Sequence, residues 1–219
     1  MNHTSFTIPL LKKGLQFGIV GEPTLLKMAI AEKGLMVLDC TAKGKAGHAA
    51  REEGDNAIHK AIKDVAWFSS YKFDRISEFI GPVKMSVTII NAGVQHNVVP
   101  HECKFTVDIR MNELYSHEEL MTIIKQHVQC EIEARSTRLR STFIAVDHPI
   151  IKAGLDLGST YYGSPTTSDK ALLPFPAVKI GPGDSARSHI ADEFIYTSEI
   201  KDGIAFYIQL LKKILLPSS

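Results

Sequence analysis

Between residues 34 and 142 the hydrophobic pattern switches repeatedly between the two-residue period of strands and the 3.6-residue period of helices. The second helical segment is marked by a capping box, because Glu119 follows Ser116 at the required spacing. The predicted elements are a strand at 34–43, a helix from Asp55 to Tyr71, strands at 83–92 and 102–111, a helix after Ser116 and a strand at 131–142. This order predicts an α+β, ferredoxin-like (βαββαβ) domain whose sheet is covered on one face by two helices.

The segments on either side of this domain follow another pattern. Residues 17–21 form a short apolar run closed by Glu22 and Pro23, which predicts a buried strand that ends in a turn. On the C-terminal side, the pattern predicts a helix at 148–158, a loop at 163–169, a strand at 176–180 and a helix at about 197–216. Strands that alternate with helices indicate an α/β domain with a parallel sheet.

The simplest architecture is one α/β domain in two pieces with another domain inserted between them. We place the pieces at residues 1–36 and 144–219 and the inserted domain at residues 37–143. The two pieces contain too few strands and helices to cover both faces of a parallel sheet, so we expect part of the α/β domain to be absent from this chain. The apolar stripe of the last helix, from Ile200 to Leu211, is attributed to core packing rather than to a membrane surface.

Charge and cysteine content exclude several classes of partner. The 219 residues include 25 lysines and arginines and 24 aspartates and glutamates, so the net charge of +1 gives no reason to expect nucleic-acid binding. The three cysteines, Cys40, Cys103 and Cys130, form no CxxC pair, so we expect neither a disulfide framework nor a cysteine zinc site. Because free cysteines are typical of a reducing compartment, we expect a cytoplasmic location. No apolar run reaches the length of a membrane span and no export signal is recognised, so a membrane is not expected as a partner.

Two side chains follow predicted strands of the α/β domain where ligands usually bind. Glu22 comes directly after the strand at 17–21, and His189 lies in the loop after the strand at 176–180. In open α/β sheets, ligands bind beyond the carboxyl ends of the strands, where a carboxylate and an imidazole suit a metal ion. A solvated turn carboxylate and a solvent-exposed loop histidine are the alternatives, and position alone leaves them open.

Three polar side chains of the inserted domain are further candidates. His48 lies in the segment GKAGHAA, where glycines let the backbone bend sharply and present the imidazole at the tip of the domain. Asn97 in QHNVVP is a potential hydrogen-bond donor, and Arg110 in DIRM is a potential carboxylate clamp. The alternatives are a surface loop histidine, a turn residue and a solvated cation at a strand edge.

Other polar residues need no functional role. Ser168 fits the N-cap of a short helix, and His59, His117 and His127 are expected on helix surfaces. The sequence contains no GxSxG, Walker, strand-associated GxGxxG or HExxH motif. Serine hydrolases, nucleotide-binding proteins and HExxH zinc peptidases therefore lack support.

Seven short motifs occur in this order: IVGEPT (19–24), GHAA (47–50), GDNAI (54–58), NVVP (97–100), DIR (108–110), TSD (167–169) and SHIADEF (188–194). Because it contains these motifs in this order, the sequence resembles the acetylornithine deacetylase and succinyl-diaminopimelate desuccinylase family of dinuclear zinc amidohydrolases. This family also includes carboxypeptidases and aminoacylases. The resemblance is greatest to the acetylornithine deacetylase branch, and it runs from about Phe17 to the C-terminus.

The resemblance implies a role for each candidate. Glu22 and His189 match terminal ligands of two zinc ions, one ligand to each ion, with cobalt as an alternative metal. His48 matches a histidine that reaches the partner subunit's active site and stabilises the tetrahedral oxyanion. Asn97 and Arg110 match substrate-binding residues, Arg110 through the α-carboxylate. The inserted domain then corresponds to a dimerisation lid of a homodimer that acts on a small N-acyl amino acid.

One part of the family pattern is absent. The resemblance implies an HxD motif, a bridging aspartate and paired glutamates, one of them the general base, and residues 1–16 contain none of these. We expect an incomplete C-terminal portion of a zinc-dependent hydrolase that removes an acyl group from N-acetylornithine or a close analogue in arginine biosynthesis, and we expect this chain alone to be inactive. A non-catalytic dimerisation or ligand-binding fragment and a related zinc exopeptidase remain open as alternatives.

Overall fold

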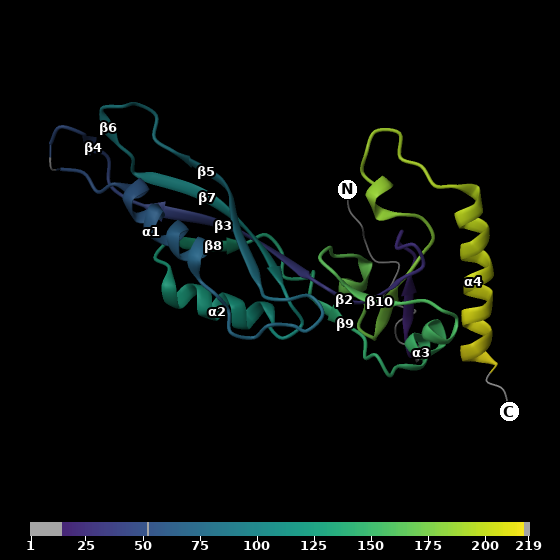
Figure 1. Cartoon of the computed structure of the whole chain (residues 1–219). Helices are drawn as coiled ribbons and strands as arrows, with labels where there is room; N and C mark the ends of the chain where they lie inside the picture. The colour runs from purple at the N-terminus through teal and green to yellow at the C-terminus, as the bar shows by residue number, and fades with distance from the viewer. Residues whose placement is uncertain (1–14, 52, 217–219) are drawn as a thin grey trace. The chain divides into compact units, whose positions relative to one another are not determined.

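The computed structural model describes residues 15–51 and 53–216, which form two compact units (Figure 1). The central unit is Lys33–Ser141, and the outer unit comprises the described residues up to Glu32 and from Thr142 onwards. The sequence analysis places the corresponding boundaries at residues 37 and 144. No helix among the described residues is long and apolar enough to cross a membrane.

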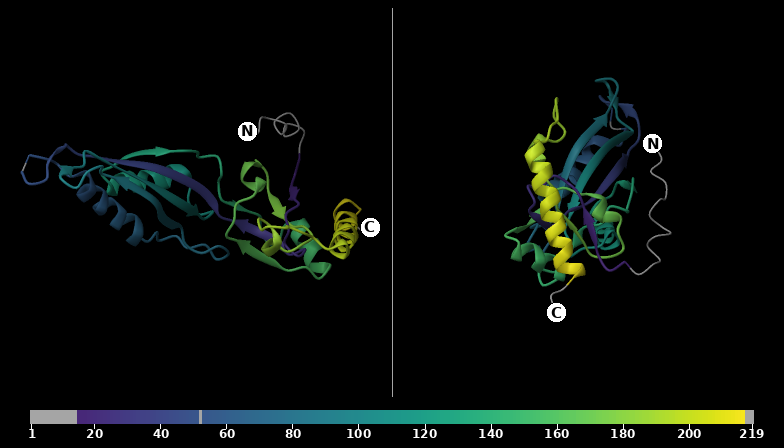
Figure 2. Two further views of the ribbon diagram at one scale, coloured as in Figure 1. Left: turned by 90° about the horizontal axis from the view of Figure 1, so that it is seen from above. Right: turned by 90° about the vertical axis from the view of Figure 1, so that its right-hand side faces the viewer.

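The central unit contains an antiparallel sheet of four strands in the order β5-β7-β3-β8. Its elements are β3 (Gly34–Lys43), β4 (Gly47–His48), α1 (Ala57–Ser70), β5 (Lys84–Ala92), β6 (Val98–Val99), β7 (Glu102–Met111), α2 (His117–His127) and β8 (Glu131–Ala134). Both helices lie on one face of the sheet (Figures 1 and 2). The predicted strands and helices are confirmed, except that the strand predicted at 131–142 ends at Ala134.

Side-chain alternation builds the core of the central unit. Met36, Leu38 and Cys40 of β3 are buried beneath the helices and alternate with half-buried residues on the other face. The predicted capping box of α2 is confirmed. The expectation of a surface position for His117 is wrong, because this residue is 5% exposed and its Nε2 lies 3.5 Å from the carbonyl oxygen of Leu35.

Asp64 connects the two helices of the central unit. This residue of α1 is 4% exposed, and its carboxylate accepts hydrogen bonds from the backbone N–H groups of Gln129 and Cys130, just after α2, at 3.1 and 3.0 Å. Asp64→Ala leaves two N–H groups without their acceptor, so we expect it to lower the free energy of unfolding by about 3 kcal/mol.

Trp67 is the only tryptophan of the chain and lies in α1, so its fluorescence during urea unfolding reports on the central unit alone. The matched control is Asp55→Ala, which removes an exposed carboxylate paired with Lys60 and is expected to cost less than about 1 kcal/mol. Equal losses for the two variants would contradict the role of Asp64 between the helices.

The outer unit contains a mixed sheet in the order β1-β11-β2-β10, with β9 beside β2. Its elements are β1 (Gly18–Val20), β2 (Met28–Glu32), β9 (Thr142–Phe143), α3 (Pro149–Asp156), β10 (Tyr161–Ser164), the 3₁₀ turn Asp169–Leu172, β11 (Ala177–Lys179), the 3₁₀ turn Ser185–Arg187 and α4 (Thr197–Leu215). The prediction of a purely parallel sheet is wrong, because β2 runs antiparallel to β11. The connection at 21–27 is too short for the crossover that parallel strands require.

The last helix differs from its prediction in what it contacts. α4 is amphipathic, and Gly203 and Leu210 are its buried residues. Ile200, Ile204, Ile208 and Leu211, which we expected to pack in a core, are between 38% and 57% exposed. Tyr207, also part of the predicted stripe, is half-buried and its hydroxyl donates to the carbonyl oxygen of Ile180. Among the described residues, the predicted core packing is therefore wrong for the four aliphatic side chains.

A buried polar cluster surrounds Glu32 at the end of β2. Glu32 is 1% exposed and pairs with the Nζ of Lys179 at 2.7 Å, while the hydroxyl of Ser168 donates to its other oxygen at 2.7 Å. Ser168 also caps the following 3₁₀ turn, so its predicted N-cap role is confirmed. Lys170 is equally buried, and its Nζ donates to the carbonyl oxygen of Ala29 at 2.9 Å. Two lysines and one glutamate thus share the interior of the outer unit.

Lys170 is expected to make the stability of the outer unit depend on pH. Burial lowers the pKa of Lys170 from 10.5 to about 8, with a smaller opposing effect from Glu32. Below pH 8 the amine is protonated in both the folded and the unfolded chain. Between about pH 8 and 10.5 the unfolded chain binds more protons, so the free energy of unfolding rises with pH, by about 3 kcal/mol in total.

Lys170→Met isolates this effect, because it removes the titrating group. The measurement is urea unfolding followed by circular dichroism from about pH 7 to about pH 11, with Trp67 fluorescence separating the transition of the central unit. Lys201→Met, on the exposed side of α4, is the matched control and should preserve the pH dependence. A constant difference between the native chain and Lys170→Met over this range would contradict the prediction.

Candidate functional site

Glu22 and His189 follow two neighbouring strands of the outer unit. β1 and β11 pair in parallel, with Val20 opposite Lys179, so their carboxyl ends lie at the same edge of the sheet. Glu22 is exposed directly after β1, and His189 is exposed in the loop after β11. Both residues therefore lie in loops that leave the same end of the sheet. Each loop follows the strand after which the sequence analysis placed the residue.

Backbone hydrogen bonds join the loops that follow these two strands. The N–H of Thr24 donates to the carbonyl oxygen of Gly181 at 3.2 Å, and the N–H of Leu25 donates to that of Gly183 at 2.8 Å. A Cβ at Gly181 would lie 2.5 Å from the carbonyl oxygen of Glu22, so the close approach requires glycine. These contacts hold the backbone of Glu22 against the start of the loop that carries His189.

The backbone of the loop that carries His189 is strained at two residues and is held by a side-chain hydrogen bond. His189 and Asp192 have φ angles of 62° and 59°, in the left-handed region that non-glycine residues seldom occupy. The carboxylate of Glu193 accepts a hydrogen bond from the backbone N–H of His189 at 2.9 Å. The sequence analysis missed Glu193 as a support, although it lies within the SHIADEF motif.

The described residues provide an incomplete set of metal ligands. A catalytic zinc ion normally has about three protein ligands. Among residues 15–51 and 53–216, no three histidine, cysteine, aspartate or glutamate side chains are grouped closely enough to hold a metal ion. Glu22 and His189 are thus suitable donors, but this part of the chain does not complete a zinc site around them.

At one end of the central unit, the structure brings His48 and Asn97 together (Figure 1). β4 pairs antiparallel with β6, with His48 opposite Val98, and the N–H of Ala49 donates to the carbonyl oxygen of Asn97 at 2.9 Å. Both candidate side chains are exposed. This end of the unit, formed by β4, β6 and their loops, is called the tip below.

A local hydrogen bond determines which nitrogen of His48 is free. The backbone N–H of Ala50 donates to the Nδ1 of His48 at 3.1 Å. Since Nδ1 is the acceptor, the neutral ring carries its proton on Nε2. His48 therefore presents an N–H donor to solvent at the tip, as stabilisation of an oxyanion requires.

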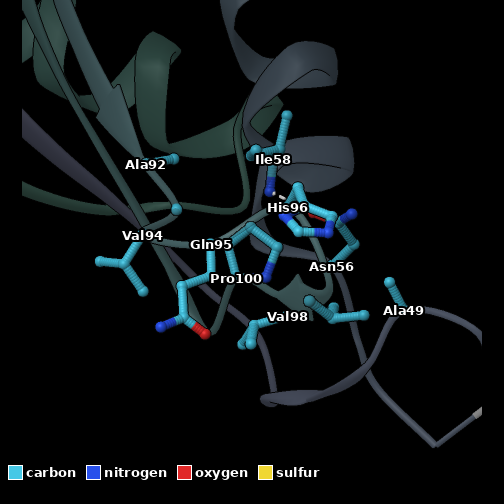
Figure 3. Close-up of a pocket in the computed structure, with 11 residues that line it drawn as sticks. Ala49, Asn56, Ile58, Ala92, Val94, Gln95, His96, Val98 and Pro100 are labelled. Atoms are coloured by element: carbon cyan, nitrogen blue, oxygen red, sulfur yellow. Dashed lines mark hydrogen bonds between the residues drawn. The ribbon is translucent and has the colours of Figure 1, made fainter.

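An open hollow of about 450 Å³ adjoins these residues at the tip (Figure 3). His96 lies close to Asn56 and Ile58 in this view, and the side chain of Asn56 caps α1 by accepting from the N–H of Ile58 at 2.9 Å. Val98 and Pro100 contribute apolar walls. The tip therefore combines polar donors with an apolar surface.

Arg110 lies at the other end of the same sheet. It is opposite Leu35 near the start of β3, and its Nε and Nη2 donate to the two carboxylate oxygens of Asp108 at 2.8 and 3.0 Å. From Glu102 to Arg110, β7 spans about 26 Å at the rise of a strand. One central unit therefore does not bring Arg110 together with His48, and its guanidinium already binds a carboxylate.

The sequence of the central unit matches a known domain. Residues 30–134 match the model of the M20 peptidase dimerisation domain. The chain is 27% identical over 217 residues to a succinyl-diaminopimelate desuccinylase of Roseobacter denitrificans, and 27% identical over 218 residues to an acetylornithine deacetylase of Buchnera aphidicola. This chain is therefore related to the M20 peptidases, and its central unit matches their dimerisation domain. The family predicted from the sequence motifs is confirmed.

Two solved structures have a fold similar to that of this chain. The aminopeptidase PepT of Bacillus cereus superimposes with a TM-score of 0.70 at 15% identity, over 91% of this chain and 57% of its own. The Bacillus subtilis protein YXEP, described as a dinuclear metal binding peptidase of the M20 family, gives 0.66 at 16% identity, over 94% and 59%. The alignments with the desuccinylase and the deacetylase cover 88% and 90% of this chain but 56% of each relative. This chain thus spans about half the length of these curated relatives.

Proposed function

We propose that this chain supplies the dimerisation lid and part of the metal site of a zinc-dependent hydrolase that removes an acyl group from an N-acyl amino acid. The observation that carries the proposal is the parallel pairing of β1 and β11, which sends Glu22 and His189 into loops at one end of the sheet. In this proposal the two residues are terminal ligands, one to each of two zinc ions, with cobalt as the alternative metal. Zinc in such sites polarises the carbonyl of the bond to be cleaved.

The substrate proposed first is N-acetylornithine or a close analogue, which assigns the protein to arginine biosynthesis. A relative named acetylornithine deacetylase supports this substrate. A succinylated diamino acid is the second candidate, because several relatives are named succinyl-diaminopimelate desuccinylase. Both are N-acyl amino acids with a second polar group, so both need the same class of site.

In the proposed mechanism, His48 donates the hydrogen bond of its Nε2–H to the oxyanion that develops at the scissile carbonyl. The bond from Ala50 to Nδ1 fixes the tautomer that this role needs. Asn97 is proposed to bind the substrate beside it, and Arg110 to bind the α-carboxylate by exchanging or sharing its partner Asp108. Since about 26 Å of β7 separates Arg110 from the tip, these residues reach one small substrate only if they come from different subunits.

The central unit, proposed as a ferredoxin-like lid, has a free edge suited to such a homodimer. β5 is an edge strand of the sheet, and Ile89 and Ile90 on it are 50% and 52% exposed. A long edge strand with exposed aliphatic side chains pairs readily with a second copy. The match of residues 30–134 to a dimerisation domain supports this arrangement.

The chain alone is proposed to be inactive, because the general base and most metal ligands have no counterpart among the residues assigned here. Two alternative functions are each supported by one observation. A non-catalytic dimerisation or ligand-binding fragment agrees with the incomplete ligand set among the described residues. A zinc exopeptidase agrees with the peptidase names of the structural neighbours.

A covalent chimera tests the proposed function. In it, this chain replaces the region of the Roseobacter denitrificans desuccinylase to which it aligns. We expect the chimera to bind zinc and to hydrolyse N-acetylornithine or N-succinyl-diaminopimelate, and Glu22→Ala and His189→Ala each to lower both zinc content and rate. Asp156→Asn, an exposed carboxylate on α3, is the matched control. Full zinc content in both Glu22→Ala and His189→Ala would contradict the proposal.

A further inference from the structure

The face of the central sheet that the helices leave uncovered carries Asp108 and Arg110. Both residues belong to β7 and lie two positions apart, so their side chains point to the same face of the sheet. The neighbouring residues Ile109 and Met111 are buried with the helices in the core of the unit. Asp108 and Arg110 therefore lie on the opposite face, where both side chains are partly exposed and open to a ligand.

The pairing with Asp108 uses one edge of the Arg110 guanidinium and leaves another edge free. The Nε–H and one N–H of Nη2 donate to the two carboxylate oxygens of Asp108, at 2.8 and 3.0 Å. A guanidinium has five N–H groups, so both N–H groups of Nη1 and the second N–H of Nη2 remain. Two of these are parallel at the end of the side chain and suit the two oxygens of a carboxylate. Arg110 can thus bind a second carboxylate while Asp108 stays in place.

Asp108 is difficult to displace from Arg110, because both residues belong to the same strand. A partner in the same chain acts at an effective concentration of about millimolar or more, whereas substrates typically have KM values between about 1 μM and 1 mM. The pair also restricts a long side chain that would otherwise lose rotamer freedom when a ligand binds. Asp108 therefore orients Arg110 towards a second carboxylate rather than competing with it.

Lys84 places a second positive charge beside Arg110. The two residues lie directly opposite each other in the pairing of β5 with β7, so their side chains leave the same face with Cβ atoms about 5 Å apart. Like charges in this position repel each other, and an anion that contacts both removes the repulsion. Burial lowers the pKa of Lys33, and the charge of Lys84 lowers it further, with a smaller opposing effect from Glu113. Positive charge is thus concentrated at this end of the sheet.

We propose that Arg110 and Lys84 form one binding site for the carboxylate of an N-acyl amino acid, and that Asp108 is a positioning residue for Arg110. The carboxylate accepts two hydrogen bonds from Nη1 and Nη2 of Arg110 and one from Nζ of Lys84. The identity of the ligand rests on the proposed function, in which Arg110 binds the α-carboxylate. The inference goes further in adding Lys84 to the site and in keeping Asp108 bound to Arg110 when the ligand enters.

A nuclear magnetic resonance titration of the 219-residue chain tests the site directly. The probes are N-acetylornithine and its α-carboxamide, which differ only in the carboxylate. The measurement is the shift of the Nε–H signal of Arg110, which is assigned by its loss in Arg110→Lys. We expect N-acetylornithine to bind with a dissociation constant at least about tenfold below that of the carboxamide.

Three variants separate positioning of Arg110 from general damage to the sheet. Asp108→Asn removes the charge that orients Arg110, so it should weaken binding of N-acetylornithine about tenfold and leave that of the carboxamide unchanged. Lys84→Met removes the second cation and should weaken binding of N-acetylornithine about threefold or more. Asp39→Asn is the matched control, because it changes the same kind of bidentate pair, with Arg135 at 2.7 and 2.9 Å, and should bind both probes as the native chain does.

The chimeric enzyme provides a second readout. In it, Asp108→Asn should raise KM for N-acetylornithine about tenfold with little change in kcat, since the α-carboxylate is bound equally before and during the reaction. A lower KM or tighter binding in Asp108→Asn would show that Asp108 competes for Arg110, which contradicts its positioning role.

The remaining outcomes also overturn the inference. Equal affinities for the two probes, or no shift with N-acetylornithine, contradict a carboxylate site at Arg110. Native affinity in Lys84→Met contradicts the role of Lys84, and equal losses in Asp108→Asn and Asp39→Asn contradict a specific role for Asp108. The proposed function fails separately: carboxylate-selective binding beside a chimera without zinc or activity contradicts only the function, whereas an active chimera without that selectivity contradicts only the binding site.

Discussion

Replacing His48 by alanine in the chimeric enzyme is expected to lower kcat about 100- to 1,000-fold with little change in KM or zinc content. The imidazole is proposed to donate to charge that exists only in the transition state, and one such donor is worth about 3–4 kcal/mol. The exposed Nε2–H, set by the bond from Ala50 to Nδ1, is the structural basis for this expectation. Steady-state kinetics with N-acetylornithine and zinc analysis of the same preparation provide the measurement.

Two variants make the His48 prediction specific. His96→Ala removes another exposed imidazole from the tip and should leave kcat nearly unchanged. His48→Gln keeps an N–H donor and should recover part of the rate. Native kcat in His48→Ala would contradict the assigned role, and equal losses in His48→Ala and His96→Ala would indicate general damage to the tip instead.

Subunit mixing tests whether His48 acts in the partner's site. Homodimers of His48→Ala and of Glu22→Ala are each expected to be nearly inactive. After exchange of equal amounts, half of the dimers are hybrids, and each hybrid has one site with both residues intact, so activity should recover to about one quarter of the native value. If His48 served its own subunit, no hybrid would contain an intact site and mixing would restore nothing.

Replacing Glu32 by glutamine is expected to lower the free energy of unfolding of the outer unit by about 3–5 kcal/mol. Glu32 is the carboxylate of the buried cluster, and the substitution leaves Lys170 and Lys179 buried without its charge. Removing one partner of a buried ion pair has this effect because the remaining charge keeps its full desolvation penalty. The loss of Glu32 should also lower the pKa of Lys170 further below about 8, since Glu32 opposes the effect of burial.

Urea unfolding followed by circular dichroism measures the effect of Glu32→Gln. Asp156→Asn is the matched control, because it breaks the exposed pair between Asp156 and Lys213 at 3.1 Å and should cost less than about 1 kcal/mol. The Trp67 transition of the central unit should not move. A loss of about 1 kcal/mol or less for Glu32→Gln would contradict the assignment of a buried, charged cluster.

The central unit was largely predictable because its signals are local. The alternation in β3 and β7 and the capping box at Ser116 are readable without knowledge of their neighbours. β2 was missed because its sequence, MAIAE, ends in Glu32. The burial of this glutamate depends on its pairing with Lys179, which is distant in sequence. β10 was missed because its glycine and serine read as part of a loop.

Of the candidate metal site, only the positions of its two residues after the ends of predicted strands could be predicted from the sequence. Glu22 and His189 were recognisable from their places after apolar runs, but the order of strands that makes β1 and β11 neighbours is a tertiary property. The separation of Arg110 from His48 also depends on register along β7, which the motifs do not encode. For α4, amphipathicity indicated a packing face, but the pattern does not say which polypeptide covers it.

Chemical crosslinking tests the convergence of Glu22 and His189 most directly. In a Cys130→Ser background, where the remaining Cys40 and Cys103 are buried, Glu22→Cys is combined with His189→Cys or with Pro174→Cys. Pro174 precedes β11 and His189 follows it, so the two residues lie in segments that leave opposite ends of this strand. We predict that a short bismaleimide joins residues 22 and 189 within one chain much faster than residues 22 and 174. Equal rates for the two pairs would contradict a common metal site for the carboxylate and the imidazole.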